Sequence, residues 1–204
     1  MRMRKKKHGA ERLDSCVGFW IENPTEYKNN WQSVFLKHAP LFIEIGCGKG
    51  GFIVEMAKLS PDKNFVAVEY NTDVLMLAAE KVKEEELYNV KLINFNAKNL
   101  SEVFGEGECS GIYLNFSDPW HKNPYQKNRL THEAFLDIYK SILKKGSEIR
   151  FKTDNKRLFD FSLWSFGQNG FDVAVGDFNV DAVTEYEMKF IAQGKDIYKA
   201  TLTV

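Results

Sequence analysis

The feature that most constrains the fold is a regular alternation of short apolar runs with longer amphipathic segments, which begins at residue 41. The apolar runs have the length and composition of buried strands and cover residues 41–45, 64–70, 90–95, 111–116 and 148–153. Apolar residues at helical spacing predict helices after each run, over residues 51–59, 72–86, 100–104, 131–144 (capped by Thr131) and 155–168. Successive strand–helix units require right-handed crossovers, so we expect a parallel sheet with helices on both faces.

The end of the chain departs from this rhythm. Two further strands are expected over residues 171–178 and 196–204, separated mainly by a short helix at 184–194. A last strand that runs antiparallel within the sheet accounts for so short a connection. We therefore predict an α/β fold with a seven-stranded, mostly parallel sheet and an antiparallel last strand. Residues 41–204 form its domain, and residues 1–40 form a basic and aromatic extension that packs against it within one compact unit.

Cysteine and histidine spacing argues against a disulfide framework and against a metal site. The three cysteines are widely separated, and neither they nor the four histidines show the spacing of metal ligands. Unpaired cysteines favour a reducing compartment. No apolar stretch approaches the roughly 18 residues that a membrane span needs, and no signal peptide is apparent at the start. The sequence therefore predicts a cytoplasmic protein with no bound metal and no membrane partner.

The charge of the chain is zero overall but unevenly distributed. The first twelve residues carry a single acid, Glu11, against six basic residues: Arg2, Arg4, Lys5, Lys6, Lys7 and Arg12. Such a basic start is either an arm that binds nucleic-acid phosphates or a solvated terminus.

A glycine-rich run after the first strand predicts a ligand site. In an open α/β sheet, ligands bind beyond the carboxyl ends of the strands. Gly46, Gly48 and Gly50 allow close approach of the backbone, and the next helix offers its N-terminal amides. The run also satisfies G-x-G-x-x-G through Gly51, so alone it does not separate a dinucleotide from another nucleoside cofactor.

Three polar residues at strand ends narrow the choice of cofactor. Glu69 closes the second strand, where a carboxylate accepts hydrogen bonds from both hydroxyls of a ribose. Glu44 stands two residues before the first glycine, where it suits a free ammonium that dinucleotides do not carry. Asn96 follows the third strand and is placed to bond an adenine edge. The alternatives are a buried ion pair for Glu44 and a turn-forming role for Asn96.

The fourth strand ends in an acid, a proline and a tryptophan, Asp118-Pro119-Trp120, and a basic loop follows. Five motifs taken together (E-I-G-C-G-K-G, V-E-Y, N-F-S-D-P-W-H-K-N-P-Y-Q-K-N-R-L, F-K-T-D-N and T-E-Y-E-x-K-F) resemble the bacterial tRNA (guanine-N7-)-methyltransferases of the TrmB type. The resemblance runs from about residue 40 to the C-terminus. It implies a class I, Rossmann-like S-adenosylmethionine-dependent methyltransferase, monomeric or homodimeric, that forms N7-methylguanosine at position 46 of the tRNA variable loop.

The same resemblance implies roles for individual residues. Asp118 is the expected catalytic residue, and the cofactor contacts are expected from Glu44, Gly46, Gly48, Glu69, Asn96 and Asp118. Substrate contacts are implied for Lys122, Asp154, Thr184, Glu185, Tyr186 and Glu187. Contacts with RNA are implied for the loop of Pro124, Tyr125, Gln126, Lys127, Asn128 and Arg129. This chain departs from the family in having Asn96 where an aspartate is usual, and in a less cationic loop.

The residue types also suggest how a target guanine is read. Guanine presents N1–H and N2–H together, which a carboxylate matches, and Asp154 and Glu187 are the candidates; alternatively, Thr184–Glu187 is a helix capping box. Trp120 and Tyr125 either stack on a splayed base or, for Trp120, pack in the core.

Other functions stay open at this stage. S-D-P-W is similar to the motif of exocyclic-amine methyltransferases, although only one proline is present. A non-catalytic RNA-binding subunit on a methyltransferase fold and a nicotinamide oxidoreductase are the remaining alternatives.

Overall fold

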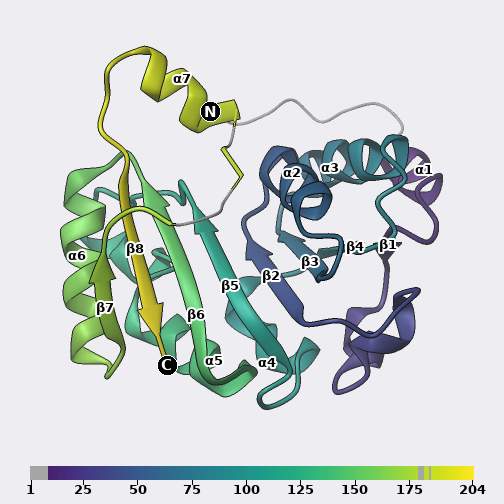
Figure 1. Ribbon diagram of the computed structural model, residues 1–204, viewed down its shortest axis with the longest axis horizontal. Helices are drawn as coiled ribbons and strands as arrows, with labels where there is room; N and C mark the ends of the chain where they lie inside the picture. The colour runs from purple at the N-terminus through teal and green to yellow at the C-terminus, as the bar shows by residue number, and fades with distance from the viewer. Residues whose placement is uncertain (1–8, 179–181, 184) are drawn as a thin grey trace.

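The computed structural model describes residues 9–178, 182–183 and 185–204. These residues form one eight-stranded sheet in the order β1-β4-β3-β2-β5-β6-β8-β7 (Figure 1). The strands are β1 (Trp20–Ile21), β2 (Leu41–Ile45), β3 (Asn64–Glu69), β4 (Val90–Asn94), β5 (Cys109–Asn115), β6 (Leu143–Thr153), β7 (Asp172–Val175) and β8 (Tyr198–Thr203).

The pairing of the strands confirms a mostly parallel sheet with an antiparallel last strand. Strands β1 to β6 pair in parallel, whereas β8 lies between β6 and β7 and is antiparallel to both. The expected count of seven strands was wrong by one. Trp20 and Ile21 pair with Leu92 and Ile93 at the edge of the sheet, and two residues are too few to show the alternation by which a strand is recognised.

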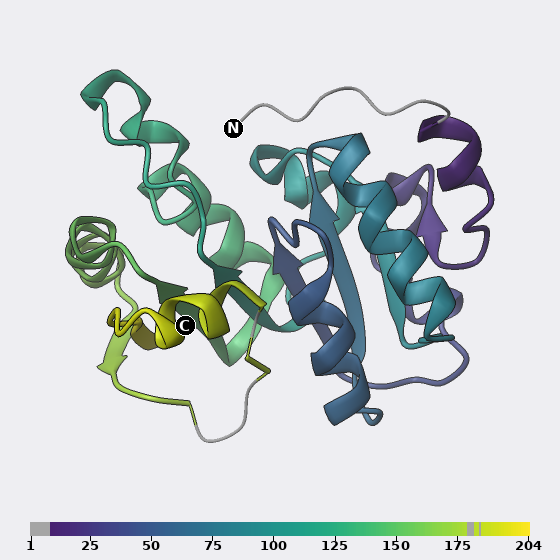
Figure 2. The same cartoon turned by 90° about the horizontal axis from the view of Figure 1, so that it is seen from above.

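Helices cover both faces of the sheet (Figure 2). One face carries α1 (Gly9–Asp14), α2 (Gly51–Leu59) and α3 (Thr72–Glu84), and the other carries α4 (Leu100–Val103), α5 (Glu133–Ile142) and α6 (Lys156–Gln168). The last helix, α7 (Glu185–Ala192), lies beyond the carboxyl ends of β5 and β6 (Figure 1). Short 3₁₀ helices span Pro24–Tyr27, Trp31–Val34, Ala97–Asn99 and Asn123–Asn128.

Each face has its own apolar core. Phe52, Ile53 and Leu75 pack under α2 and α3, whereas Phe135 and Phe166 pack under α5 and α6, and all five are buried. Burial of a side chain of this size contributes about 1.5–3 kcal/mol relative to exposure. The two cores hold the sheet rigid, so that residues at the strand ends keep fixed positions.

The start of α5 corrects one expectation from the sequence. The helix begins at Glu133 and its cap is His132, whose Nδ1 accepts from the Ala134 amide at 3.4 Å. Thr131 is buried instead and shares a 2.7 Å hydrogen bond with Ser162. The Thr131 hydroxyl points into the core because Ser162 on α6 offers it a buried hydrogen-bond partner. The sequence pattern does not reveal this partner.

The segment before β2 packs against both faces. Leu13 and Phe19 join the core under α2 and α3, whereas Trp31 is fully buried on the opposite face, where its indole nitrogen donates to the Val103 carbonyl at 3.0 Å. Arg12 makes two hydrogen bonds of 2.7 Å to Glu80 on α3. None of the helices described has the length and apolar character needed to cross a membrane.

Candidate active site

The glycine run forms a tight turn between β2 and α2. The amides of Gly46 and Cys47 both donate to the Val68 carbonyl, at 2.8 and 3.1 Å, which ties the turn to the end of β3. Gly50 has a φ of +77° and caps α2, and a Cβ at this position would lie 2.8 Å from the Cβ of Ala78. A side chain there would therefore push α3 away, so glycine lets the turn lie close against that helix.

Glu69 has a fixed orientation at the end of β3. Its two carboxylate oxygens accept from the Gly48 amide at 3.1 Å and from the Asn71 amide at 2.9 Å. These bonds join the glycine turn to the start of α3. Because each carboxylate oxygen has a second lone pair, Glu69 can also accept hydrogen bonds from ligand hydroxyls.

The larger of two cavities at this edge of the sheet is about 620 Å³ and contains Glu69, Asn96 and Asp118 in its lining. Asn96 follows β4, and its side-chain oxygen accepts from the Lys98 amide at 3.0 Å. The residue therefore forms the turn that begins Ala97–Asn99 and also lines the cavity. A polar wall of this kind suits a nucleoside.

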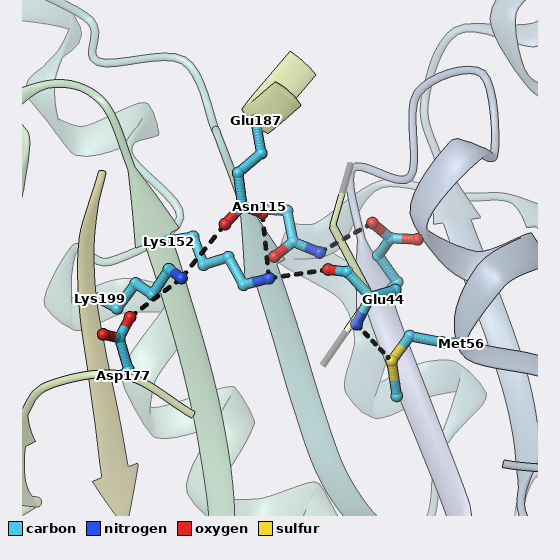
Figure 3. A network of polar contacts seen from close by, with 8 residues as sticks. Glu44, Met56, Asn115, Lys152, Asp177, Glu187 and Lys199 are labelled. Atoms are coloured by element: carbon cyan, nitrogen blue, oxygen red, sulfur yellow. Dashed lines mark hydrogen bonds and ion pairs between the residues drawn. The ribbon is translucent and has the colours of Figure 1, made fainter. Parts of the chain in front are cut away.

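The smaller cavity is about 330 Å³. Gly46 and Phe116 line both the smaller and the larger cavity. Glu44, only 2% exposed, lies in its wall and accepts from the side-chain amide of Asn115 at 3.1 Å (Figure 3). The amide oxygen of Asn115 is buried and has no hydrogen-bond partner among the residues described. The wall thus offers several acceptors and a negative charge, which suit a ligand ammonium.

The pKa of a thiol in the glycine turn reflects the negative charge of this wall. The pKa of the Cys47 thiol is raised well above its usual value, first by burial and then by the negative charges of Glu44 and Glu69. A cationic ligand between these carboxylates would offset their mutual repulsion.

The loop after β5 holds Asp118 at the rim of the larger cavity. Phe116 and Trp120 have φ values of +49° and +42°, a left-handed conformation that costs a non-glycine residue about 1–3 kcal/mol. Arg129 supports the loop, because its guanidinium donates to the carbonyls of Pro119 at 2.8 Å and Trp120 at 3.5 Å. Asp118 is exposed between the two strained residues.

The basic loop divides into outward and inward side chains. Lys122, Tyr125 and Lys127 are exposed, whereas Arg129 is 7% exposed and its guanidinium lies 4.4 Å from the centroid of the Phe161 ring. Pro124 is also exposed, and Gln126 and Asn128 are partly so. Arg129 thus supports the Asp118 loop, and the prediction that residues 124–129 contact RNA stays a prediction.

Trp120 is 39% exposed and lines the larger cavity, its ring centroid 6.1 Å from that of Tyr125. The alternative that Trp120 packs in the core is therefore wrong.

Helix α7 brings Tyr186 next to the loop after β5. Tyr186 lines the smaller cavity and packs on Phe116, with ring centroids 5.1 Å apart. Its pKa is raised, first by burial and then by the charges of Asp154 and Asp118. Asp154, which directly follows β6, therefore lies in the same electrostatic neighbourhood as Asp118.

The other residues of the T-E-Y-E motif differ in their placement. Thr184 lies outside the described residues, and Glu185 begins α7. Glu187 is 1% exposed, and its oxygens lie 3.3 Å from the Nζ of Lys152 and 3.2 Å from that of Lys199. The structure thus places Glu187 between two lysines beneath the helix, apart from Tyr186 in the wall of the smaller cavity.

Three residues of this region were not singled out from the sequence: Asn115, Lys152 and Lys199. Asn115 stands two residues before the S-D-P-W stretch, so its place at the end of β5 was the available signal. Lys152 occurs in the F-K-T-D-N motif, but neither lysine was recognisable as an ion-pair partner of Glu187, since the pattern of a strand does not show which partner a charged residue takes. Within the described part of the chain, no group of three or more His, Cys, Asp or Glu side chains could hold a metal ion.

Solved structures share this fold. A precorrin-6y C5,15-methyltransferase from Geobacter metallireducens aligns with a TM-score of 0.60 and 16% identity over 99% of this chain and 91% of that one. The aminoglycoside resistance methyltransferase NpmB1 aligns with a TM-score of 0.63 and 15% identity, over 86% of this chain and 92% of that one. The architecture is that of class I S-adenosylmethionine-dependent methyltransferases.

Sequence comparison is more specific. A family profile described as "Putative methyltransferase" (Methyltransf_4) matches residues 38–200. A tRNA (guanine-N(7)-)-methyltransferase from Geobacillus sp. (strain WCH70) is 45% identical over 206 residues, covering 98% of this chain and 94% of that protein. The protein of the same name from Bacillus subtilis (strain 168) is 44% identical over 207 residues, covering 98% and 97%. On the strength of these matches over nearly its whole length, this chain belongs to the tRNA (guanine-N(7)-)-methyltransferase family.

Proposed function

We propose that this protein transfers the methyl group of S-adenosylmethionine to N7 of a guanine in tRNA, at position 46 of the variable loop. The observation that carries the proposal is the meeting of two cavities at Gly46 and Phe116, with Asp118 at the rim of the larger one and Tyr186 in the wall of the smaller one. One cavity suits a nucleoside and the other an amino acid, as the two halves of this cofactor require.

The residues that line the cavities fit the cofactor. Glu69, held by two backbone amides, accepts from the ribose hydroxyls, and Asn96 bonds the adenine. Glu44, with the buried oxygen of Asn115 beside it, binds the ammonium. Gly46 and Gly48 bring the backbone of the turn close to the ligand. When bound, the cofactor supplies a methyl sulfonium.

Methylation of guanine N7 needs no general base. Guanine N7 carries an in-plane lone pair and no proton, so the protein need only align it with the methyl group, and such alignment can supply about 7–11 kcal/mol of the barrier. Positive charge passes to the purine ring during transfer. Asp118 at the rim stabilises that charge and orients the base. This explains why an acid, without a nucleophile and base pair, stands in the loop after β5.

The substrate is recognised at two levels. Asp154 accepts from the Watson–Crick edge of guanine, Trp120 or Tyr125 stacks on the splayed base, and Tyr186 closes the rim. RNA phosphates are bound by the exposed Lys122 and Lys127 and by the basic start of the chain. These contacts give an affinity that does not depend on the RNA sequence. Three free cysteines agree with activity in the cytoplasm.

The test is methyl transfer to an unmodified tRNA transcript, followed by mapping of the modified base. Borohydride and aniline cleave RNA at N7-methylguanosine, so the expected product is cleaved at a single guanine of the variable loop. A transcript in which this guanine is replaced by adenosine is the control. Modification at an exocyclic amine would support the alternative methyltransferase class, and binding of tRNA without transfer would indicate a non-catalytic subunit.

A further inference from the structure

An ion-pair network centred on the buried Lys152 and Glu187 joins the sheet to α7, and we call its four charged residues the Lys152 network: Lys152, Asp177, Glu187 and Lys199 (Figure 3). Lys152 is on β6, and its side chain is 2% exposed. Its Nζ lies 3.3 Å from Glu187 Oε2 and donates to the Ala182 carbonyl at 3.0 Å. One ammonium thus binds the chain both before α7 and within it.

The ion pairs of Lys199 extend the network to β8. Lys199 on β8 lies 3.2 Å from Glu187 Oε1 and 3.1 Å from Asp177 Oδ1. The Ala182 amide lies 3.3 Å from the sulfur of Met56 on α2. Ala182 is therefore bound to β6 and α2, and Glu187 to β6 and β8.

The network lies against the wall of the smaller cavity. Lys152 pairs with Asn115 in the register of β5 and β6, and its carbonyl accepts from the Phe116 amide at 2.9 Å. Its Nζ lies 5.2 Å from the ring centroid of Phe52. Asn115, Phe116 and Phe52 all line the cavity, as does Tyr186 of α7. A shift of Lys152 would therefore displace lining residues of the smaller cavity both on the sheet and on α7.

Apolar packing uses only part of α7 among the residues that the structure describes. The helix has eight residues, and helices this short are unstable alone in water. Met188 and Ile191 on it are 53% and 57% exposed, so its apolar side chains are only partly used in packing. Burial of charges is costly, so a buried ion pair often adds little net stability, and its use here is the geometry that it fixes.

We propose that Lys152 is a positioning residue for methyl transfer, which holds α7 across the cofactor cavity through Ala182 and Glu187. Glu187 serves as the counter-ion of Lys152 and Lys199, and Asp154 alone reads the guanine edge. The proposal rests on the proposed function, since it concerns the alignment of the same substrate. Methyl transfer by the wild-type protein tests that function separately, because the rate of each variant is compared with the wild-type rate.

The first test replaces Lys152 with Met, which keeps the length of the side chain and removes its charge. We expect kcat to fall by about 10²-fold, the loss that a misplacement of roughly 1 Å typically causes. Lys156→Met is the matched control, because Lys156 on α6 is exposed and forms its ion pair with Asp160 on the same helix; its rate should stay that of the wild type. A folded Lys152→Met variant with the wild-type rate would overturn the proposal.

A second variant separates positioning from folding. Lys152→Met combined with Glu187→Leu removes both charges and replaces them with apolar side chains of similar size, which typically restores stability. We expect the urea midpoint to return toward that of the wild type while kcat stays low. If the rate recovers together with the midpoint, the network only stabilises the fold and the proposal fails.

The third measurement compares guanosine with inosine at the target position, since inosine lacks the exocyclic amine. A carboxylate that accepts from N1–H and N2–H loses one bond with inosine. Asp154→Asn should therefore cost less on inosine than on guanosine, whereas Glu187→Gln and Lys152→Met should each cost the same on both. A smaller loss for Glu187→Gln on inosine would show that Glu187 touches the base, and would contradict the assignment.

Discussion

Replacement of Glu69 with Ala tests how the protein holds the nucleoside half of its cofactor. In the structure this carboxylate accepts from the Gly48 amide at 3.1 Å and the Asn71 amide at 2.9 Å. The substitution removes both bonds, as well as those to the ribose. A hydrogen bond to a charged group contributes about 1.5–3 kcal/mol. Loss of one such bond from the complex corresponds to an increase of about 10- to 150-fold in the Kd of S-adenosylmethionine.

The assay is isothermal titration calorimetry with S-adenosylhomocysteine and with its 2′-deoxyribose analogue. If Glu69 bonds the ribose directly, the deoxy analogue already lacks one partner, so the substitution should weaken its binding less than that of the parent ligand. If Glu69 acts only by shaping the glycine turn, the two losses should be equal. An unchanged Kd for both ligands would refute the role of Glu69, and tight binding of a dinucleotide would refute the cofactor assignment.

Two other predictions concern the tail and the thiols. Deletion of residues 1–7, which lie outside the described residues, should lower tRNA affinity and flatten its salt dependence by about one counterion for each phosphate that the tail neutralises; unchanged binding and an unchanged salt slope would mean that the tail is only solvated. Burial raises the pKa of Cys47 and Cys109 well above the usual value, so the unfolded chain loses these protons first, and the free energy of unfolding should fall above about pH 8.5, by up to roughly 1.4 kcal/mol per pH unit for each thiol. Urea titrations between pH 7 and 10 measure this, with Cys109→Ala as the comparison; an identical pH dependence in that variant would contradict the reasoning for Cys109.

The sequence predicted the frame of the fold because strands and helices alternate with clear periods. The expected helix at 51–59 agrees with α2 at both ends, since a glycine turn precedes it and Pro61 follows shortly after. β1 was missed because two residues show no period. The cap of α5 was misplaced by one residue, because a buried hydroxyl on α6 competes for Thr131.

The site was predictable only in part. Glu44, Glu69 and Asp118 lie at strand ends, and parallel strands bring such ends to one edge of a sheet, so their proximity follows from the fold. The roles of Arg129 and Glu187 do not follow in this way. Both occur in motifs that suggest contact with RNA or substrate, yet Arg129 bonds the Pro119 carbonyl and Glu187 pairs with two lysines. Only the tertiary structure shows which partner a charged side chain takes.

The most direct test of the central claim is single-turnover methyl transfer by Asp118→Asn, with enzyme and cofactor saturating so that weakened binding cannot lower the rate. The substitution is nearly isosteric and keeps the packing of the loop, but it removes the charge that stabilises the cationic purine. We predict that transfer to guanine N7 slows by about 10²–10³-fold while cofactor affinity changes little. A wild-type rate in this variant would contradict the account, since Asp118 would then only end a strand.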